Sequence, residues 1–205
     1  MKIKICGITN REDALNAIAL NVDAIGFIFY KNSPRYVAAE RIEEFILDLP
    51  PFINTVGVFV DAEYDEIIEA CERCKLTSIQ LHGSESPEFC TKFKYPVVKA
   101  IKVSNSDDLK NIPNYKGTVN GILLDTKAEN VHGGTGRTFD WGLAIEAKEY
   151  ETPLILSGGI NSTNIEKALK LVNPYGIDLC SGVEREPGLK DYNKMQELLD
   201  IVNKK

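Results

Sequence analysis

Short runs of aliphatic and β-branched residues recur along the whole chain, and a stretch with helix-like spacing of apolar positions follows most of them. Runs of four to six such residues are typical of strands that are buried on both faces, as in parallel sheets. Successive runs begin 19 to 33 residues apart, which fits a strand, a crossover helix and two short loops. The eight predicted strands cover residues 3–6, 24–29, 55–60, 78–81, 97–101, 121–125, 154–157 and 177–180.

The segments between these strands carry helix signals of their own. Asn10 is a suitable N-cap for a helix that runs to about Leu20. Apolar residues three and four apart predict further helices over residues 63–74 after Asp61, 163–172 opened by Asn161, and 190–202. Residues 104–109 are the weakest helix signal and are expected to form only a turn or two.

Eight strand–helix units that close on themselves make a (β/α)8 barrel, a fold of about 250 residues with a practical minimum near about 200. The 205 residues of this chain leave room for one such TIM barrel, spanning 1–205 as a single domain. The rival is a doubly wound open sheet, which usually has a Gly-rich fingerprint after its first strand. Here that loop reads Cys6-Gly7-Ile8-Thr9, so the barrel is the preferred prediction.

The composition and net charge of the chain indicate which kinds of molecule it is expected to bind. Hydrophobic residues make up 43% of the chain and charged residues 26%, as in an ordinary globular protein. With 24 basic and 30 acidic residues the net charge is −6, which argues against nucleic acid or a membrane surface as a partner. We find no signal peptide and no apolar run of the ~20 residues that a membrane helix needs. Five scattered cysteines then predict a cytoplasmic protein without disulfides.

Cys71 and Cys74 form a Cys-x-x-Cys pair, which in other settings marks a redox or zinc site. Redox pairs use the N-terminus of a helix to stabilise the thiolate, whereas this pair falls late in the predicted helix. A structural zinc ion needs two further ligands at suitable spacing, and none stands nearby in the sequence. We therefore interpret the pair as structural.

Polar residues and glycines gather where the predicted strands end, and in this fold the active site lies at the carboxyl ends of the strands. Gly158-Gly159 follows the seventh strand and Ser181-Gly182 follows the eighth. Such barrels commonly bind phosphate there, because glycine lets backbone N–H groups approach an anion closely. A plain turn into a helix is the alternative interpretation of these glycines.

Three reactive or charged residues stand at the same predicted rim. Cys6 ends the first strand on the same face as Lys4, while the aliphatic neighbours of both point the other way, so Lys4 and Cys6 are expected inside the barrel. Asp125 ends an otherwise apolar strand, and Arg35 follows the second strand with a fork of donors that suits a carboxylate or phosphate. A buried inert cysteine, a capping carboxylate and a solvent-facing arginine are the alternatives.

A longer set of motifs spans nearly the whole chain, in order and in register with the predicted barrel. They are KICGIT at 4–9, GFIF at 26–29, SPR at 33–35, VGVF at 56–59, QLHG at 80–83, LLD at 123–125, GGTG at 133–136, FDW at 139–141, SGG at 157–159, Asp178, SGVE at 181–184 and PGLKD at 187–191. Together these segments resemble the phosphoribosylanthranilate isomerase family of tryptophan biosynthesis.

The resemblance implies an Amadori rearrangement of N-(5-phosphoribosyl)anthranilate to 1-(2-carboxyphenylamino)-1-deoxyribulose 5-phosphate. By the resemblance, Asp125 is the general acid at the ribose ring oxygen and Cys6 the general base at C2. Arg35 would contact the anthranilate carboxylate, and the glycine loops would hold the phosphate. No metal or organic cofactor is implied, and the chain is expected to be a monomer or a homodimer.

The remaining residues carried over by the resemblance are all expected to bind substrate. They are His82, Gly134, Gly136, Gly158, Gly159, Asp178, Ser181 and Gly182. Cys180 is a departure, because the family usually has a small polar residue at this position.

The implied mechanism makes an electrostatic demand on the catalytic pair. It needs a thiolate at Cys6 together with a protonated Asp125, whereas reference pKa values of about 8.5 and 3.9 favour the reverse by about 4.6 units, or roughly 6 kcal/mol. Burial raises the pKa of an aspartate and a nearby cation lowers that of a cysteine. Lys4 is the expected cation, although Asp178 on the neighbouring eighth strand would weaken its effect by pairing with it.

Three other functions are weighed against this one. The isomerase of histidine biosynthesis performs the same rearrangement but uses an aspartate where Cys6 stands. Pentose-phosphate epimerases need a metal site rich in histidine and carboxylate, and the chain has only two histidines. A non-catalytic phosphate-binding barrel would have no need of both Cys6 and Asp125.

Overall fold

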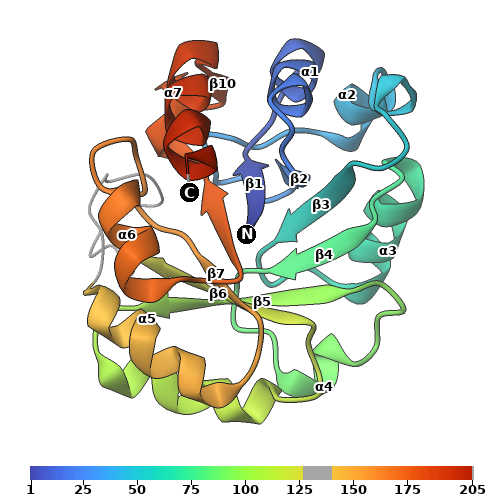
Figure 1. The fold of residues 1–205 in the computed structure, drawn as a ribbon. Helices are drawn as coiled ribbons and strands as arrows, with labels where there is room; N and C mark the ends of the chain where they lie inside the picture. The colour runs from blue at the N-terminus through green and yellow to red at the C-terminus, as the bar shows by residue number, and fades with distance from the viewer. Residues whose placement is uncertain (127–139, 205) are drawn as a thin grey trace.

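The computed structural model describes residues 1–126 and 140–204. Eight parallel strands form a closed barrel in chain order (Figure 1). Their bounds are β1 Lys2–Cys6, β2 Ala24–Ile28, β3 Asn54–Phe59, β4 Ser78–Leu81, β5 Val97–Val103, β6 Gly121–Thr126, β7 Leu154–Leu156 and β8 Gly176–Leu179. Each predicted strand is present with ends shifted by at most two residues. Because β1 pairs with both β2 and β8, the ring closes and the open-sheet alternative is wrong.

Helices and turns surround the barrel. The α-helices of the described residues are α1 Arg11–Ala19, α2 Ala39–Glu43, α3 Tyr64–Arg73, α4 Pro87–Cys90, α5 Trp141–Ala147, α6 Ile165–Val172 and α7 Tyr192–Asn203. The 3-10 helices are η1 Ile46–Asp48, η2 Ser106–Tyr115, η3 Lys148–Tyr150 and η4 Ser181–Val183. A short hairpin of β9 (Glu184–Glu186) and β10 (Leu189–Lys190) lies between β8 and α7.

Side-chain caps decide where several helices begin. Asn10 caps α1 as predicted, its side-chain oxygen accepting a hydrogen bond from the N–H of Asp13 at 2.9 Å. The predicted start of the last helix at residue 190 is wrong, because Lys190 belongs to β10 and Asp191 is the N-cap. The helix expected from residue 163 starts at Ile165 instead, because Asn161 and Asn164 hydrogen-bond into a turn ahead of it.

The segment predicted as a turn or two after β5 is longer than expected. It forms the 3-10 helix η2, which Asn105 and Asp108 cap with reciprocal hydrogen bonds. Leu109, Ile112 and Tyr115 are buried on one side of it. The spacing of three between them matches the 3-10 period, which a search for the α-helical period misses.

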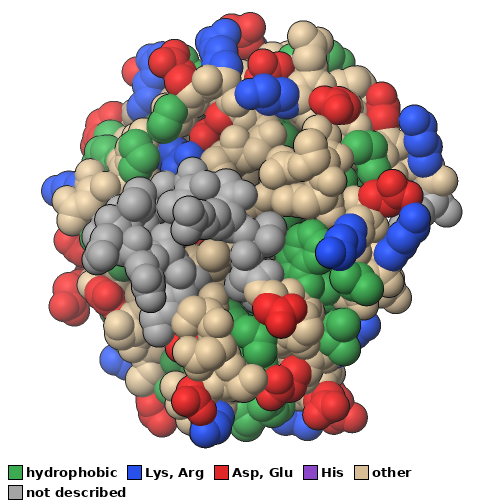
Figure 2. All heavy atoms as spheres, turned by 90° about the vertical axis from the view of Figure 1, so that its left-hand side faces the viewer, with side chains coloured by type: hydrophobic (Ala, Val, Ile, Leu, Met, Phe, Trp, Pro, Cys, Tyr) green, Lys and Arg blue, Asp and Glu red, His purple; other side chains and the backbone are tan. Residues whose placement is uncertain are grey.

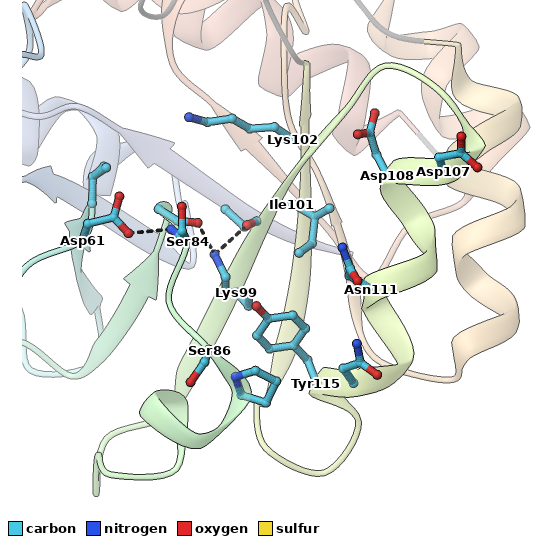
Figure 3. Close-up of a pocket in the computed structure, with 15 residues that line it drawn as sticks. Asp61, Ser84, Ser86, Lys99, Ile101, Lys102, Asp107, Asp108, Asn111 and Tyr115 are labelled. Carbon is cyan, nitrogen blue, oxygen red and sulfur yellow. Dashed lines mark hydrogen bonds between the residues drawn. The ribbon is translucent and has the colours of Figure 1, made fainter.

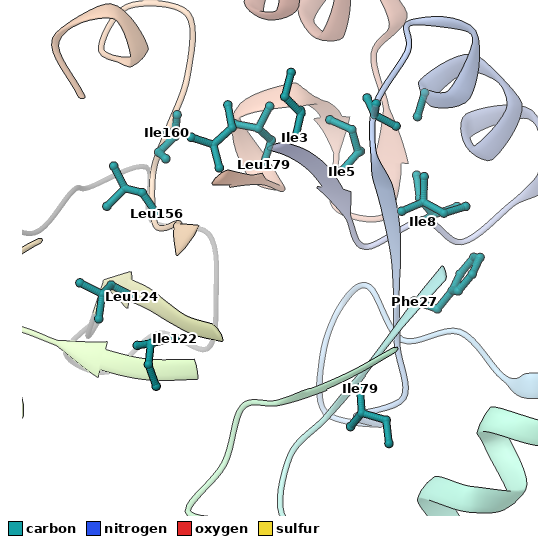
Figure 4. Close-up of a cluster of buried hydrophobic side chains, with 14 of the residues drawn as sticks. Ile3, Ile5, Ile8, Phe27, Ile79, Ile122, Leu124, Leu156, Ile160 and Leu179 are labelled. Atoms are coloured by element: carbon teal, nitrogen blue, oxygen red, sulfur yellow. The ribbon is translucent and has the colours of Figure 1, made fainter. Parts of the chain in front are cut away.

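The two faces of β1 pack in different environments, as the alternation predicts. Ile3 and Ile5 belong to the main apolar cluster between the sheet and the helices (Figure 4). Cys6 and Lys4 point into the barrel instead: a Cβ at Gly26 of β2 would lie 3.0 Å from Cys6 Sγ and 3.0 Å from Lys4 Cε. The absence of a side chain at residue 26 therefore makes room for both groups.

Cys71 and Cys74 are buried in the apolar cluster between α3 and the sheet. Burial raises the pKa of Cys71 to about 12 and that of Cys74 to about 11. These shifts keep both groups as thiols at neutral pH, in agreement with a structural role.

The net negative charge does not gather into one patch on the face shown in Figure 2, where acidic and basic side chains are interspersed around the edge. The arrowheads of β3 and β4 in Figure 1 point toward the side that Figure 2 turns to the viewer. In the parts of the chain that the structure describes, no helix is long and apolar enough to cross a bilayer.

Candidate active site

Lys4 and Asp178 form a buried ion pair inside the barrel, beneath Cys6. Lys4 Nζ lies 2.9 Å from Asp178 Oδ1, and their side chains are 10% and 4% exposed. The pair follows from the register of β1 and β8, which sets Lys4 opposite Asp178. The predicted pairing is present, so much of the positive charge of Lys4 is neutralised by Asp178 before it acts on Cys6.

The resting thiol of Cys6 is held in its protonated form. A hydrogen bond with the Cys180 side chain and burial both raise the pKa of Cys6, and the lowering effect of Lys4 is smaller. Burial also raises the pKa of Asp178 against the opposing effect of Lys4. Lys4 thus acts in the expected direction, and its pairing with Asp178 limits the effect, as the sequence analysis anticipated.

Arg35 is buried in a second charged cluster beside Cys6. Its Nε and Nη2 atoms donate to both carboxylate oxygens of Glu184 at 2.7–3.1 Å, and Lys190 Nζ lies 2.8 Å from the same carboxylate. Arg35 is therefore not a solvent-facing arginine. Two of its three nitrogens are committed to Glu184, which leaves Nη1 to face a ligand.

Asp125 and His82 stand across the barrel on β6 and after β4. His82 Nε2 lies 3.2 Å from Asp125 Oδ2, and Gln80 Nε2 lies 3.0 Å from His82 Nδ1. Contacts at both ring nitrogens therefore hold the imidazole between Gln80 and Asp125. The Asp125 side chain is 29% exposed, and the N–H of Thr126 donates to its Oδ1 at 2.8 Å.

The two glycine loops lie beside this carboxylate at the ends of β7 and β8. Gly158 has φ +81°, and a Cβ there would lie 2.9 Å from Asp125 Oδ1 and 2.6 Å from the N of Thr126. The backbone N–H groups of Gly158 and Gly159 donate to no described residue. Ser181 and Gly182 lie in the adjacent turn η4. Two neighbouring loops of this kind can present N–H groups to one anion.

Most of the predicted site residues thus come together at one end of the barrel. The exceptions are Gly134 and Gly136, which lie outside the described residues. Asp178 is present but points down to Lys4 rather than into the mouth, so its carboxylate supports the site from below.

A comparison with known families settles which family this arrangement belongs to. The family model for N-(5'-phosphoribosyl)anthranilate (PRA) isomerase matches residues 3–201. The chain belongs to the phosphoribosylanthranilate isomerase family. The resemblance seen in the sequence is therefore confirmed, and the protein is an enzyme of the isomerase class.

Individual relatives agree over their full lengths. The N-(5'-phosphoribosyl)anthranilate isomerase of Geotalea uraniireducens (strain Rf4) is 46% identical over 198 residues, covering 97% of this chain and 96% of the relative. The crystal structure of phosphoribosyl anthranilate isomerase from Thermotoga maritima has a TM-score of 0.93 and 40% identity, with 100% of both chains covered. A crystal structure of such an isomerase in complex with reduced 1-(o-carboxyphenylamino)-1-deoxyribulose 5-phosphate has a TM-score of 0.90 and 38% identity, with 100% of both chains covered.

Within this phosphoribosylanthranilate isomerase fold, the site includes residues that sequence reasoning did not single out. Gln80 orients His82. The only sequence signal for this role is that Gln80 precedes His82 by two residues, which places both side chains on the same face of the strand. Glu184 and Lys190 both lie in segments of the family resemblance, but the ion pairs of Glu184 with Arg35 and with Lys190 depend on the β9–β10 hairpin.

A separate cavity of about 610 Å³ opens between the loops after β3, β4 and β5 (Figure 3). Lys99 lies at its base, with Nζ 3.0 Å from Glu85 Oε2 and 2.8 Å from the Gly83 carbonyl oxygen. The hydroxyl of Tyr115 donates to the Glu85 carbonyl oxygen. Since protein groups already satisfy the buried charge of Lys99, the cavity presents no unpaired buried group to a ligand. None of the predicted site residues in the described part of the chain lines it.

Proposed function

We propose that this chain catalyses the Amadori rearrangement of N-(5-phosphoribosyl)anthranilate to 1-(2-carboxyphenylamino)-1-deoxyribulose 5-phosphate, with Asp125 as general acid and Cys6 as general base. The observation that carries the proposal is the placement of the two groups. Both face the same barrel mouth from opposite sides, and the glycine loops after β7 and β8 lie there too. Membership in the phosphoribosylanthranilate isomerase family supports the same reaction.

Asp125 donates the first proton in this mechanism. Protonated Asp125 gives its proton to the ribose ring oxygen, the C1–O bond breaks, and the nitrogen lone pair forms an iminium at C1. His82 holds one carboxylate oxygen at 3.2 Å, and the N–H of Thr126 donates to the other at 2.8 Å. These two contacts fix the orientation of the carboxyl group, which general acid catalysis requires.

Cys6 removes the second proton. Its thiolate takes the proton from C2, and the C–H electron pair moves to form an enolamine, which tautomerises to the ketone. Since Cys6 rests as a thiol hydrogen-bonded to Cys180, this step first requires the thiol proton to pass from Cys6 to solvent. The buried ammonium of Lys4 then stabilises the thiolate, because opposite charges interact strongly at such depth.

The two anionic ends of the substrate are assigned to separate groups. The phosphate is proposed to bind the N–H groups of Gly158, Gly159 and Gly182 with the hydroxyl of Ser181. The anthranilate carboxylate is proposed to meet Arg35 through Nη1, the nitrogen that Glu184 leaves unused. An acidic protein can hold a dianion in this way, because the positive potential is local.

The fluorescence of phosphoribosylanthranilate gives a direct test, since the signal decays when the ring opens and rearranges. Purified protein is expected to consume it without added cofactor, and Asp125→Asn is the matched control. Absence of consumption by a folded protein would overturn the proposal. Turnover of the histidine-pathway aminoaldose at a greater rate would instead favour that alternative isomerase.

The cytoplasmic location and the choice between monomer and homodimer stay predictions. All five cysteines lie in the described part of the chain and none is in a disulfide, which suits a reducing compartment. Sedimentation of the purified protein over a range of concentrations would decide its oligomeric state.

A further inference from the structure

Cys180 follows β8, beside the strand that Cys6 ends, and the proposed reaction gives it no role. The register of β1 and β8 pairs Lys4 with Asp178 and Ile5 with Leu179. Continued by one residue beyond the end of β8, this register would set Cys180 beside Cys6. Neighbouring parallel strands lie about 4.8 Å apart, within the Cα separation of about 4.4–6.8 Å that a disulfide bridges.

Cys180 Sγ lies against the backbone next to Cys6. A Cβ at Gly7, the residue after Cys6, would lie 3.2 Å from Cys180 Sγ, and one at Gly26 would lie 3.0 Å from Cys6 Sγ. A hydrogen bond with Cys180 raises the pKa of Cys6, and neither cysteine is in a disulfide.

Cys180 lies next to Lys190 and Arg35 of the second charged cluster. The hydrogen bond from Cys6 lowers the pKa of Cys180, and Lys190 and Arg35 add to this against the opposing effect of burial. Lys190 Nζ lies 3.9 Å from Cys180 Sγ. Cys180 is also the most accessible of the five cysteines, since the other four are buried. A thiolate that solvent can reach is the form that oxidants attack.

The remaining cysteines provide an internal contrast. Burial raises the pKa of Cys90 to about 11, and the pKa values of Cys71 and Cys74 are raised in the same way. No cation lies close enough to any of the three to reverse this shift. Selective chemistry at Cys180 is therefore expected among five thiols.

We propose that Cys6 and Cys180 form an oxidation-sensitive pair, in which a peroxide converts the two thiols to a disulfide and removes the base. The Cys180 thiolate attacks one peroxide oxygen, the O–O bond breaks, and a sulfenic acid forms with release of water. The Cys6 sulfur then attacks Cys180 Sγ, the S–O bond breaks, and a second water leaves. In sum, two thiols and one hydrogen peroxide give one disulfide and two waters. Loss of activity as the consequence rests on the proposed function, whereas formation of the disulfide does not.

Peptide mapping of the full chain can detect this bond without an activity measurement. Trypsin separates the five cysteines into five peptides, covering residues 5–11, 42–73, 74–75, 76–92 and 171–185. Reduced protein is treated with a small excess of hydrogen peroxide, alkylated to cap free thiols, and digested without reductant. We expect a cross-linked species of 5–11 with 171–185, two hydrogens lighter than the sum of the peptides, and complete alkylation of the other three.

Activity on phosphoribosylanthranilate is followed in the same samples. It should fall in proportion to the cross-linked species and return when dithiothreitol is added. Each protein is compared with its own activity in reductant, so that a substitution near the site does not distort the comparison.

Cys180→Ser is the matched variant, since it retains Cys6 but cannot form the bond. Its rate of inactivation by peroxide is expected to fall at least about tenfold, because each unit by which burial raises the pKa of Cys6 lowers its thiolate fraction tenfold. Cys6→Ser retains Cys180, which should then give a sulfenic acid that dimedone traps. Cys180→Ala replaces the serine variant if that protein fails to fold.

The outcomes separate the two proposals. A 5–11 to 171–185 cross-link in a protein that is inactive on the substrate would leave the thiol pair standing and overturn the proposed function. An active enzyme whose cross-link is absent, or joins residues 71 and 74 instead, would overturn the thiol pair. Equal peroxide sensitivity of wild type and Cys180→Ser would also overturn it.

Discussion

The two sides of the barrel mouth differ in how deeply their charged side chains are buried and in how those charges are paired. Around Cys6, the side chains of Lys4 and Asp178 are 10% and 4% exposed, and those of Arg35 and Glu184 are 7% and 4% exposed. Every one of these charges is paired within the protein. Asp125, by contrast, is 29% exposed and rests against a histidine that is 18% exposed.

This difference separates what each side contributes. A buried charge that loses its partner destabilises the fold by several kcal/mol, whereas an exposed carboxylate can be neutralised with little effect on folding. The residues around Cys6 therefore contribute both to the stability of the fold and to catalysis, whereas Asp125 contributes to catalysis alone. Substitutions on the two sides should differ in whether they change turnover, the free energy of unfolding, or both.

Removing either member of the catalytic pair should have the largest effect. Asp125→Asn and Cys6→Ala are each expected to lower kcat by ~10²–10⁴, the range of general acid–base contributions. The free energy of unfolding of Asp125→Asn should stay within about 0.5 kcal/mol of wild type, since no buried ion pair is broken. Steady-state kinetics and urea unfolding measure the two quantities. Near-normal turnover in either purified variant would remove that residue from the mechanism.

Glu184→Gln should show the reverse pattern, with stability as the main loss. It leaves the buried cations Arg35 and Lys190 without their carboxylate, which is expected to destabilise the fold by about 3–5 kcal/mol. The matched control is Glu44→Gln in the exposed pair with Arg41, where a change below about 1 kcal/mol is expected. An equal loss of unfolding free energy in the two variants would show that burial of the Arg35–Glu184 pair adds nothing to the stability of the fold.

The buried cluster of Arg35, Glu184 and Lys190 also affects how substrate binding by an Arg35→Met variant is interpreted. From the sequence, this substitution is expected mainly to weaken substrate binding. In the structure it also leaves Glu184 with Lys190 as its remaining cationic partner among the described residues, so part of the effect falls on folding. Binding by this variant is interpretable only where unfolding measurements show that it is folded.

The barrel could be predicted from the sequence because its signals are local. Strand spacing, the alternation at Lys4 and Cys6, and the Asn10 cap all depend on residues close together in the chain, and each is present in the structure. The placement of Asp125 at a strand end follows in the same way. What failed were boundaries set by distant contacts, such as the start of α7, where the N–H of Lys190 donates to Asp13 Oδ2 at 2.8 Å across 177 positions of the sequence.

The partners within the site were harder to predict for a related reason. The Lys4–Asp178 pair could be anticipated because ring closure brings β1 beside β8. The engagement of Arg35 by Glu184 joins residues 149 positions apart through a loop and a hairpin, and no periodic pattern encodes it. The raised pKa of Cys6 depends on Cys180, whose side-chain direction the sequence does not give.

A pair of glycines tests how tightly the Asp125 side is fixed by its backbone. Gly158 and Gly117 have nearly the same φ, +81° and +80°, but a Cβ at residue 117 would meet nothing within 4 Å. Gly117→Ala should therefore lose about 1 kcal/mol from the left-handed backbone alone. Gly158→Ala adds a clash with Thr126 and Asp125, so we expect a larger loss, about 2–3 kcal/mol, together with a higher KM. Identical behaviour of the two variants in unfolding and kinetics would mean that the loop relaxes freely around Asp125.

The smallest effect should come from acid, and it acts on the side of Cys6. Burial opposes the charge on Glu184, but the bonds from Arg35 and the charge of Lys190 outweigh it, and the pKa of Glu184 is lowered. A carboxyl group with a lowered pKa stabilises the fold fully above its unfolded pKa of about 4.3, and this contribution is lost as the pH falls through the lower folded value. In urea unfolding between pH 7 and pH 3, the wild-type free energy should therefore decline faster below about pH 4.3 than that of Glu184→Gln, so the two curves approach each other. Curves that stay parallel down to pH 3 would show that the buried pair on the Cys6 side contributes no acid-dependent stability.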